Sequence, residues 1–301
     1  MSSNSFPLLV LQPTLGPSQD WAGVRVLGAE AADAATLHRL FDEFGLAQAV
    51  SGLDCLLPAV ALALLAGAEL PAGLVLRTDT GEPPPAPPEH PPGKGPTQAL
   101  LLKILAQITG DAETRDLEAT LKQDPTLSVQ LLRLVNSVAF APNTRINSFA
   151  HAITLLGRRQ LQRWLQLLLY AGQSGGANNP LLTTAALRAA LMESLCKASR
   201  ADKAIQDEAF MVGMFSLLDR LFGKPLPEIV APLNLVRDVS DALLERSGKL
   251  GELLSLIVAA ESGPDAISPG LRRAGIDNEA WCKVQIEALG WTLKISRESQ
   301  A

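Results

Sequence analysis

A proline-rich stretch, EPPPAPPEHPPGKGP, divides the chain at residues 82–96. It holds 8 of the 21 prolines in a sequence of 301 residues. Proline fixes φ and has no backbone N–H, so this stretch suits neither a helix nor the interior of a sheet and is typical of an extended linker. The sequence therefore predicts a first domain at residues 1–81, a linker at 82–96 and a second domain at 97–295.

The first segment has the pattern of a small α/β domain. Two short apolar runs, LLVLQP (Leu8–Pro13) and AGLVLRT (Ala72–Thr78), are typical of buried strands. The stretches at residues 34–45 and 58–68 favour helices, and Gly45 is expected to end the first of them. These short elements are too few to fill a large domain, so a small unit is expected.

The second segment is predicted to be helical. Aromatic residues make up only 4% of the chain, and most of its apolar residues are Leu and Ala. This composition favours helix over strand. Asp124-Pro125 combines an N-cap residue with proline at the first helical position, which is a strong start signal. Further helices are expected at 97–110, 148–157, 158–170, 181–200, 205–222, 226–231, 235–246, 249–261 and 277–295. The chain is therefore predicted to be mainly α.

Charge and cysteine content limit the function classes. Residues 1–96 carry a net charge of −6 and residues 97–301 a net charge of +1, and no long basic run exists, so direct nucleic-acid binding is not expected. The longest apolar stretch, residues 58–68, is about half of the roughly 20 residues that a membrane span needs. The three cysteines are widely spaced, and the N-terminus lacks the features of a secretory signal. A cytoplasmic protein with reduced thiols and no membrane contact is expected.

Residue patterns for catalysis are sparse. The chain has three histidines; none is followed by Asp, no two share a helical turn, and nucleophile-elbow and phosphate-loop motifs are absent. His151 is interpreted as a half-buried histidine bonded to a backbone carbonyl, with a pocket near Asn136 and His151 as the alternative. No catalytic residue, no metal and no cofactor is therefore expected.

A basic cluster on one predicted helix is the candidate binding surface. Arg159 and Arg163 share a face at i, i+4, and Arg158 lies about 100° from Arg159. Three alternatives are open. In the first, carboxylates of another helix neutralise the cluster. In the second, the cluster binds an acidic protein partner or the acidic N-terminal region of the same chain. In the third, it binds a nucleotide phosphate.

The stretch from Leu101 to Gly172 resembles the HDOD domain, a helical relative of the HD phosphohydrolases. The resemblance depends on four motifs that occur in order: Asp124-Pro125-Thr126-Leu127, then Leu131 to Asn136-Ser137, then Ile146 to Ile153, then Leu156-Gly157. It implies a helical HDOD bundle of the HD-superfamily type, preceded by the small α/β domain. It also implies that Asp124, Pro125, Leu131, Asn136, Ser137 and Gly157 have structural roles. HDOD domains lack the His-Asp metal ligands of their relatives, and so does this chain.

Later segments, at Arg163-Trp164, Ala209–Val230 and Glu287–Trp291, resemble the bacterial subgroup in which an EAL domain precedes HDOD. The N-terminal region resembles the opening of an EAL domain, the cyclic di-GMP phosphodiesterase fold, through Gln12-Pro13. At positions where that family supplies metal ligands, this chain has Arg25, Pro58 and Arg77. The resemblance thus implies a truncated, degenerate EAL-like region, and an unrelated small α/β cap is the alternative.

Together these features predict a non-catalytic bacterial signal-transduction module. It is expected to act through protein–protein interaction within cyclic di-GMP signalling, with unidentified protein partners and a homodimer as one option. A sensor of a nucleotide or another small ligand is the alternative, and residual cyclic di-GMP hydrolysis ranks last, because an arginine cannot ligate Mg²⁺.

Overall fold

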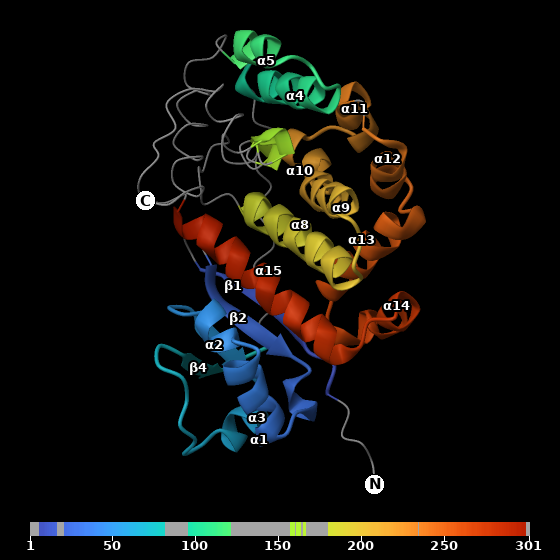
Figure 1. The fold of residues 1–301 in the computed structure, drawn as a ribbon. Coiled ribbons are helices and arrows are strands. Elements are labelled where there is room, and N and C mark those ends of the chain that lie inside the picture. The colour runs from blue at the N-terminus through green and yellow to red at the C-terminus, as the bar shows by residue number, and fades with distance from the viewer. Residues whose placement is uncertain are drawn as a thin grey trace.

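The computed structural model describes residues 6–16, 21–81, 96–121, 157–159, 161–163, 165–166, 180–233 and 235–298. A small sheet with short helices lies on one side of a long C-terminal helix, and a larger set of helices lies on the other side (Figure 1). The fold is mainly α with a small N-terminal sheet, as the sequence predicts. The predicted linker lies almost entirely outside the described residues.

The N-terminal part is built on four strands in the order β1-β2-β3-β4. They are β1 (Val10–Leu15), β2 (Trp21–Leu27), β3 (Asp54–Leu57) and β4 (Val75–Thr78). The first pair is antiparallel and the other two pairs are parallel, so the connections after β2 and β3 cross over through helices. The register aligns Gln12, Arg25, Leu56 and Arg77 in one row across the sheet.

Short helices cover the face of the sheet that carries Val24, Val26 and Leu57. Their bounds are η1 (Ala29–Ala31), α1 (Ala34–His38), the π-helical η2 (Arg39–Glu43), α2 (Leu46–Ala49) and α3 (Ala59–Leu64). Asp33 begins α1, where its carboxylate accepts a hydrogen bond of 2.8 Å from the backbone N–H of Thr36. The predicted helix end at Gly45 is confirmed by a left-handed backbone with φ of 78°.

The helical part begins at α4 and includes most of the helices that the sequence predicts. Their bounds are α4 (Pro96–Thr109), α5 (Thr114–Leu121), α8 (Pro180–Ala198), α9 (Lys203–Phe215), α10 (Leu218–Phe222), α11 (Leu226–Val230), η4 (Ala231–Leu233), α12 (Arg237–Leu244), α13 (Gly248–Ala260), η5 (Pro264–Ala266), α14 (Ser268–Ala274) and α15 (Asn278–Glu298). The single helix predicted at 205–222 is two helices, α9 and α10, and α14 was not predicted. One large apolar core joins these helices.

The closest approach between α8 and α9 occurs at Gly213. A Cβ atom at this position would lie 2.4 Å from the backbone N and Cα of Ala189, closer than any real contact. The two helices therefore meet backbone to backbone, and glycine is required there because no side chain fits.

We expect Gly213→Ala to lower the free energy of unfolding by about 1–3 kcal/mol, because the added methyl group forces α8 and α9 apart. Gly290→Ala, in α15, is the matched control. A Cβ at Gly290 would meet Ala49 at 3.6 Å, an ordinary contact, and alanine is better than glycine inside a helix by about 0.5–1 kcal/mol. Urea denaturation of both variants tests this expectation, and equal losses would contradict it.

The C-terminal helix α15 contributes to both cores. Trp281, Val284 and Ala288 belong to the core of the helical part, whereas Cys282, Ile286, Leu289 and Leu293 belong to the core beneath the sheet. Figure 1 shows α15 running between α8 and the strands. The helix is therefore shared between the two predicted domains.

Polar side chains of α15 also satisfy the outer edge of β1. The side-chain oxygen of Gln285 accepts a hydrogen bond of 2.8 Å from the Leu11 N–H, and Trp281 Nε1 donates one of 3.1 Å to the Leu9 carbonyl. An unpaired strand edge carries backbone groups that need partners when they are buried. The helix supplies these partners and thereby ties the sheet to the helical part.

Among the helices in the described ranges, none combines the length and the apolar character needed to cross a membrane. The three cysteines are buried free thiols. Burial raises the pKa of Cys55 and of Cys282 to about 12, so neither thiol ionises near neutral pH.

Candidate functional site

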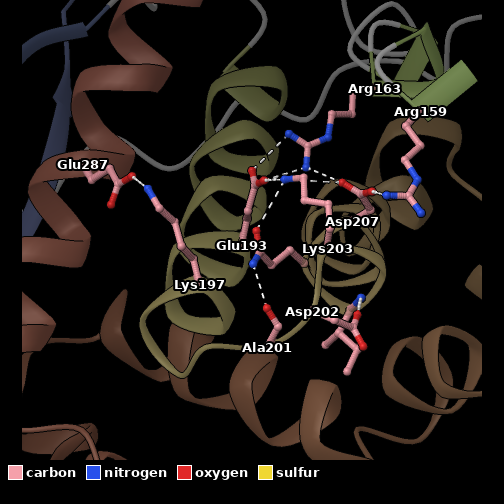
Figure 2. A network of polar contacts seen from close by, with 11 residues as sticks. Arg159, Arg163, Glu193, Lys197, Ala201, Asp202, Lys203, Asp207 and Glu287 are labelled. Atoms are coloured by element: carbon pink, nitrogen blue, oxygen red, sulfur yellow. Dashed lines mark hydrogen bonds and ion pairs between the residues drawn. The ribbon is translucent and has the colours of Figure 1, made fainter. Parts of the chain in front are cut away.

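The basic cluster predicted from the sequence lies against two other helices of the same chain. Arg163 donates two hydrogen bonds to the carboxylate of Glu193 on α8, of 2.6 and 3.2 Å, and a third of 2.8 Å to Asp207 on α9 (Figure 2). The side chain of Arg163 is 17% exposed, and those of the two acids are 20% and 21% exposed. Arg163 therefore joins α8 and α9 to the helical residues 161–163.

Two more cations complete this network. Lys203 Nζ lies 3.0 Å from Glu193 Oε1, and Arg159 Nη1 lies 3.4 Å from Asp207 Oδ2. Three cations thus share two carboxylates, and the network carries a net charge of +1. The side chains of Arg159 and Lys203 are 64% and 56% exposed, so both can also contact another molecule.

The local sequence explains why α9 brings these groups to the network. Asp202 accepts a hydrogen bond of 2.9 Å from the backbone N–H of Ile205 and so begins α9 at Lys203. Lys203 and Asp207 then lie one helical turn apart on the same face. The next turn places the Phe210 ring beneath the Arg163 guanidinium, 4.5 Å from its Cζ atom.

The acid–base state of Glu193 follows from this setting. Burial alone would raise the pKa of its carboxyl above the ordinary value of 4.5, but the hydrogen bonds and charges of Arg163 and Lys203 outweigh burial and lower it. A carboxyl whose pKa is lower in the folded state stabilises the fold above the unfolded-state value. This stabilisation disappears as the pH falls through the folded-state pKa.

We therefore expect Glu193→Gln to melt at a lower temperature than the natural protein at neutral pH, with a difference that shrinks as the pH falls below 4.5. Glu287→Gln is the control, because Glu287 pairs with Lys197 in an exposed position and should change the melting temperature little at any pH. Melting curves over this pH range test the expectation. A pH-independent difference for Glu193→Gln would contradict it.

The third arginine of the cluster has a different partner. Arg158 Nη1 lies 3.3 Å from Asp111 Oδ1, on the turn after α4. Of the alternatives for the cluster, pairing with carboxylates of other helices is therefore present for Arg159 and Arg163, whereas Arg158 pairs with a carboxylate on a turn. The carboxylates that pair with them in the described residues belong to the helical part, not to the acidic N-terminal region.

Most of the HDOD motif lies outside the described residues. This is so for Asp124, Pro125, Leu131, Asn136, Ser137 and His151, and therefore also for the predicted pocket near Asn136 and His151. Gly157 is described and has a left-handed backbone with φ of 77°, a conformation that glycine adopts without steric cost.

The row of residues across the sheet carries two arginines that are paired with acids. Arg25 Nε lies 2.9 Å from Asp79 Oδ1, and Arg77 pairs with Asp54. Within the described ranges, no group of three or more His, Cys, Asp or Glu side chains is arranged to hold a metal ion. This face of the sheet offers paired ions rather than a metal centre.

A mainly apolar cavity of about 260 Å³ lies where β1 meets α8, α13 and α15. Trp21, Leu187 and Trp281 are among its walls. Its buried cation, Arg188, is held by the Glu261 carboxylate at 2.6 and 2.8 Å and donates a further hydrogen bond to Ser216. The cavity can accept an apolar group, but the Arg188 guanidinium already has its hydrogen-bond partners within the chain.

The functional residues that the sequence analysis missed are the acids of the network and Lys203. One signal was present, because Lys203 and Asp207 have ion-pair spacing directly after a helix-capping Asp. Glu193 is also one of the few charged residues of α8, together with Arg188 and Lys197.

Comparison with known proteins matches residues 97–224 to the HDOD domain. The chain is 32% identical over 181 residues to the Vibrio cholerae protein named cyclic di-GMP phosphodiesterase CdgJ, a match that covers 60% of this chain and 42% of CdgJ. It is 31% identical over 175 residues to the Bacillus subtilis protein YuxH, covering 57% of this chain and 42% of YuxH. The chain thus spans less than half the length of these curated relatives.

Among solved structures, the MmoQ response regulator of Methylococcus capsulatus matches 65% of this chain and 98% of its own, with 19% identity and a TM-score of 0.31. That score is too low to support an argument about the fold. The network of Arg163, Glu193 and Asp207 falls within the residues that match the family model. The chain therefore contains an HDOD domain, at residues 97–224.

Proposed function

We propose that this chain acts in the breakdown of cyclic di-GMP, as the HDOD-containing part of a phosphodiesterase. The observation that carries this proposal is the 32% identity over 181 residues to a protein named a cyclic di-GMP phosphodiesterase. The match covers 42% of that relative, so the activity of the whole relative is proposed, not established, for this chain.

This comparison corrects the function predicted from the sequence. The predictions that the chain is a non-catalytic module and that it is not an enzyme are wrong, because the relative CdgJ is named a phosphodiesterase, which is an enzyme. The absence of His-Asp pairs, and of acidic ligands at Arg25, Pro58 and Arg77, does not exclude a phosphodiesterase, because such an enzyme can hold its ligands at other positions.

The EAL resemblance of residues 1–81 is part of the proposal. It is supported by the register of the sheet, which places Arg25 and Arg77 in one row on either side of Leu56, whereas Pro58, the third ligand position, directly follows β3 and lies outside this row. Arginine at these positions repels a divalent cation. The proposal therefore places metal-assisted hydrolysis away from this row.

Within the HDOD domain, we assign substrate contact to Arg159. Its side chain is 64% exposed and has one ion pair of 3.4 Å, whereas Arg163 is 17% exposed and fully engaged. An exposed guanidinium suits the phosphates of a cyclic dinucleotide.

We also propose that the protein is cytoplasmic and that it binds a protein partner. The proposed domain boundaries are at residues 81 and 96.

Expression in a bacterium that makes cyclic di-GMP tests the proposed function. We expect the cellular content of this nucleotide, measured by mass spectrometry of extracts, to fall relative to an empty vector. Arg159→Gln is the matched variant, since it removes the proposed phosphate contact at an exposed side chain and should weaken the effect while the protein stays folded. An unchanged content in cells that contain folded protein would contradict the proposal.

A further inference from the structure

A second cationic site lies far along the chain from the arginine cluster, between the end of α8, α13 and α14. These elements enclose a pocket of about 410 Å³. Leu253, Leu256 and Ile276 form part of an apolar wall. The charged residues that line it are Arg246, Lys249, Arg273 and Glu252, so the pocket carries a net charge of +2.

The three cations of this pocket lack ion-pair partners. Within the part of the chain that the structure describes, no carboxylate lies within ion-pair distance of Arg246, Lys249 or Arg273. Arg163 and Arg188, in contrast, each bind a carboxylate through two hydrogen bonds. Three unpaired cations around one pocket favour an anion from outside the chain.

The backbone fixes the position of one of these cations. Arg246 directly follows the end of α12, where a left-handed residue with φ of 55° closes the helix and the Ser247 N–H donates to the Asp241 carbonyl. A Cβ at Gly251 would lie 2.3 Å from the Arg246 carbonyl carbon, so α13 packs directly on this residue.

The electrostatic setting of Arg246 agrees with this interpretation. Burial, followed by the charge of Arg188, lowers the pKa of Arg246, and Asp219 only partly opposes the change. An anion bound in the pocket would stabilise the charged form of Arg246 and so oppose this lowering of its pKa.

The chemistry of the walls defines the ligand class. Guanidinium groups bind phosphate oxygens in pairs, and the apolar wall accepts a carbon framework attached to the phosphate. The Ser199 and Ser255 hydroxyls already donate to the carbonyls of Leu195 and Gly251, so the cations rather than these hydroxyls are the donors for a phosphate. We propose that the pocket between α8, α13 and α14 binds a small organic phosphate. This proposal is independent of cyclic di-GMP hydrolysis.

Titration calorimetry of the full chain tests the pocket with three probes: phenyl phosphate, inorganic phosphate and phenol. We expect saturable binding of phenyl phosphate at one site, weaker binding of inorganic phosphate because it lacks the ring, and no saturable binding of phenol. The double variant Lys249→Gln with Arg273→Gln should weaken phenyl phosphate binding about tenfold or more, which corresponds to about 1.4 kcal/mol.

Arg237→Gln is the matched control, since Arg237 is an exposed helix residue outside the pocket and should leave binding unchanged. Both substituted side chains are exposed, so we expect the double variant to fold, and melting curves check that it does. Unchanged affinity in the folded double variant, or failure of phenyl phosphate to saturate the natural chain, would overturn the proposal. Neither result bears on hydrolysis, because the probes contain no phosphodiester.

Discussion

Replacing Trp281 by alanine is expected to lower the free energy of unfolding by about 3–5 kcal/mol, the usual cost of removing a large aromatic side chain from a core. Trp281 has no exposed surface and belongs to the core of the helical part. Its indole N–H also donates to the Leu9 carbonyl on β1. The substitution therefore opens a cavity and weakens the connection between the helical part and the sheet.

Urea denaturation followed by far-ultraviolet circular dichroism measures this loss. Trp281→Phe is the matched variant, because it keeps a large apolar ring and removes the indole N–H. The Leu9 carbonyl still accepts a hydrogen bond of 3.0 Å from Gln285 Nε2, so the phenylalanine variant should lose much less. Equal losses in the two variants would contradict the packing described for α15.

Replacing Arg163 by methionine is expected to cost about 2–4 kcal/mol, because it leaves two mostly buried carboxylates without their main partner. Glu193 would then keep Lys203 at 3.0 Å, and Asp207 would keep only the longer ion pairs with Arg159 at 3.4 Å and Lys203 at 3.8 Å. The methionine side chain preserves much of the packing over the Phe210 ring, so the loss reports mainly on charge.

Arg237→Met is the control for this substitution. Its side chain is 90% exposed and pairs with Asp241 within one helix, so the change should cost no more than about 0.5 kcal/mol. The combined variant Arg163→Met with Glu193→Gln should recover part of the stability, because one uncompensated charge is removed. A loss for Arg163→Met as small as that of Arg237→Met would show that the network does not hold α8 and α9 together.

The periodic parts of the fold could be predicted from the sequence. The helices with strong apolar faces, such as α13 and α15, lie within a few residues of their predicted bounds. Strand β2 was not predicted from its pattern, because it has Ala22 and Gly23 near its start and Arg25 at its centre. Helix α14 was missed because it contains Pro269 and Gly270, although proline is well tolerated in a first helical turn.

The candidate site could be predicted only in part. The i, i+4 spacing placed Arg159 and Arg163 on one face, but it could not name their partners. Glu193 is 30 residues and Asp207 is 44 residues from Arg163, so they meet only through the packing of α8 on α9. The pocket with Arg246 was not predicted either, because its cations come from separate elements and form no run in the sequence.

The measurement that tests the proposed function most directly is hydrolysis by the purified chain. Cyclic di-GMP would be incubated with the protein and Mg²⁺ or Mn²⁺, and the nucleotides separated by chromatography. The account predicts that water opens one phosphodiester bond to give the linear dinucleotide, at a rate proportional to the protein concentration and absent in a heat-denatured sample. Folded protein that forms no linear product with either metal would contradict the account.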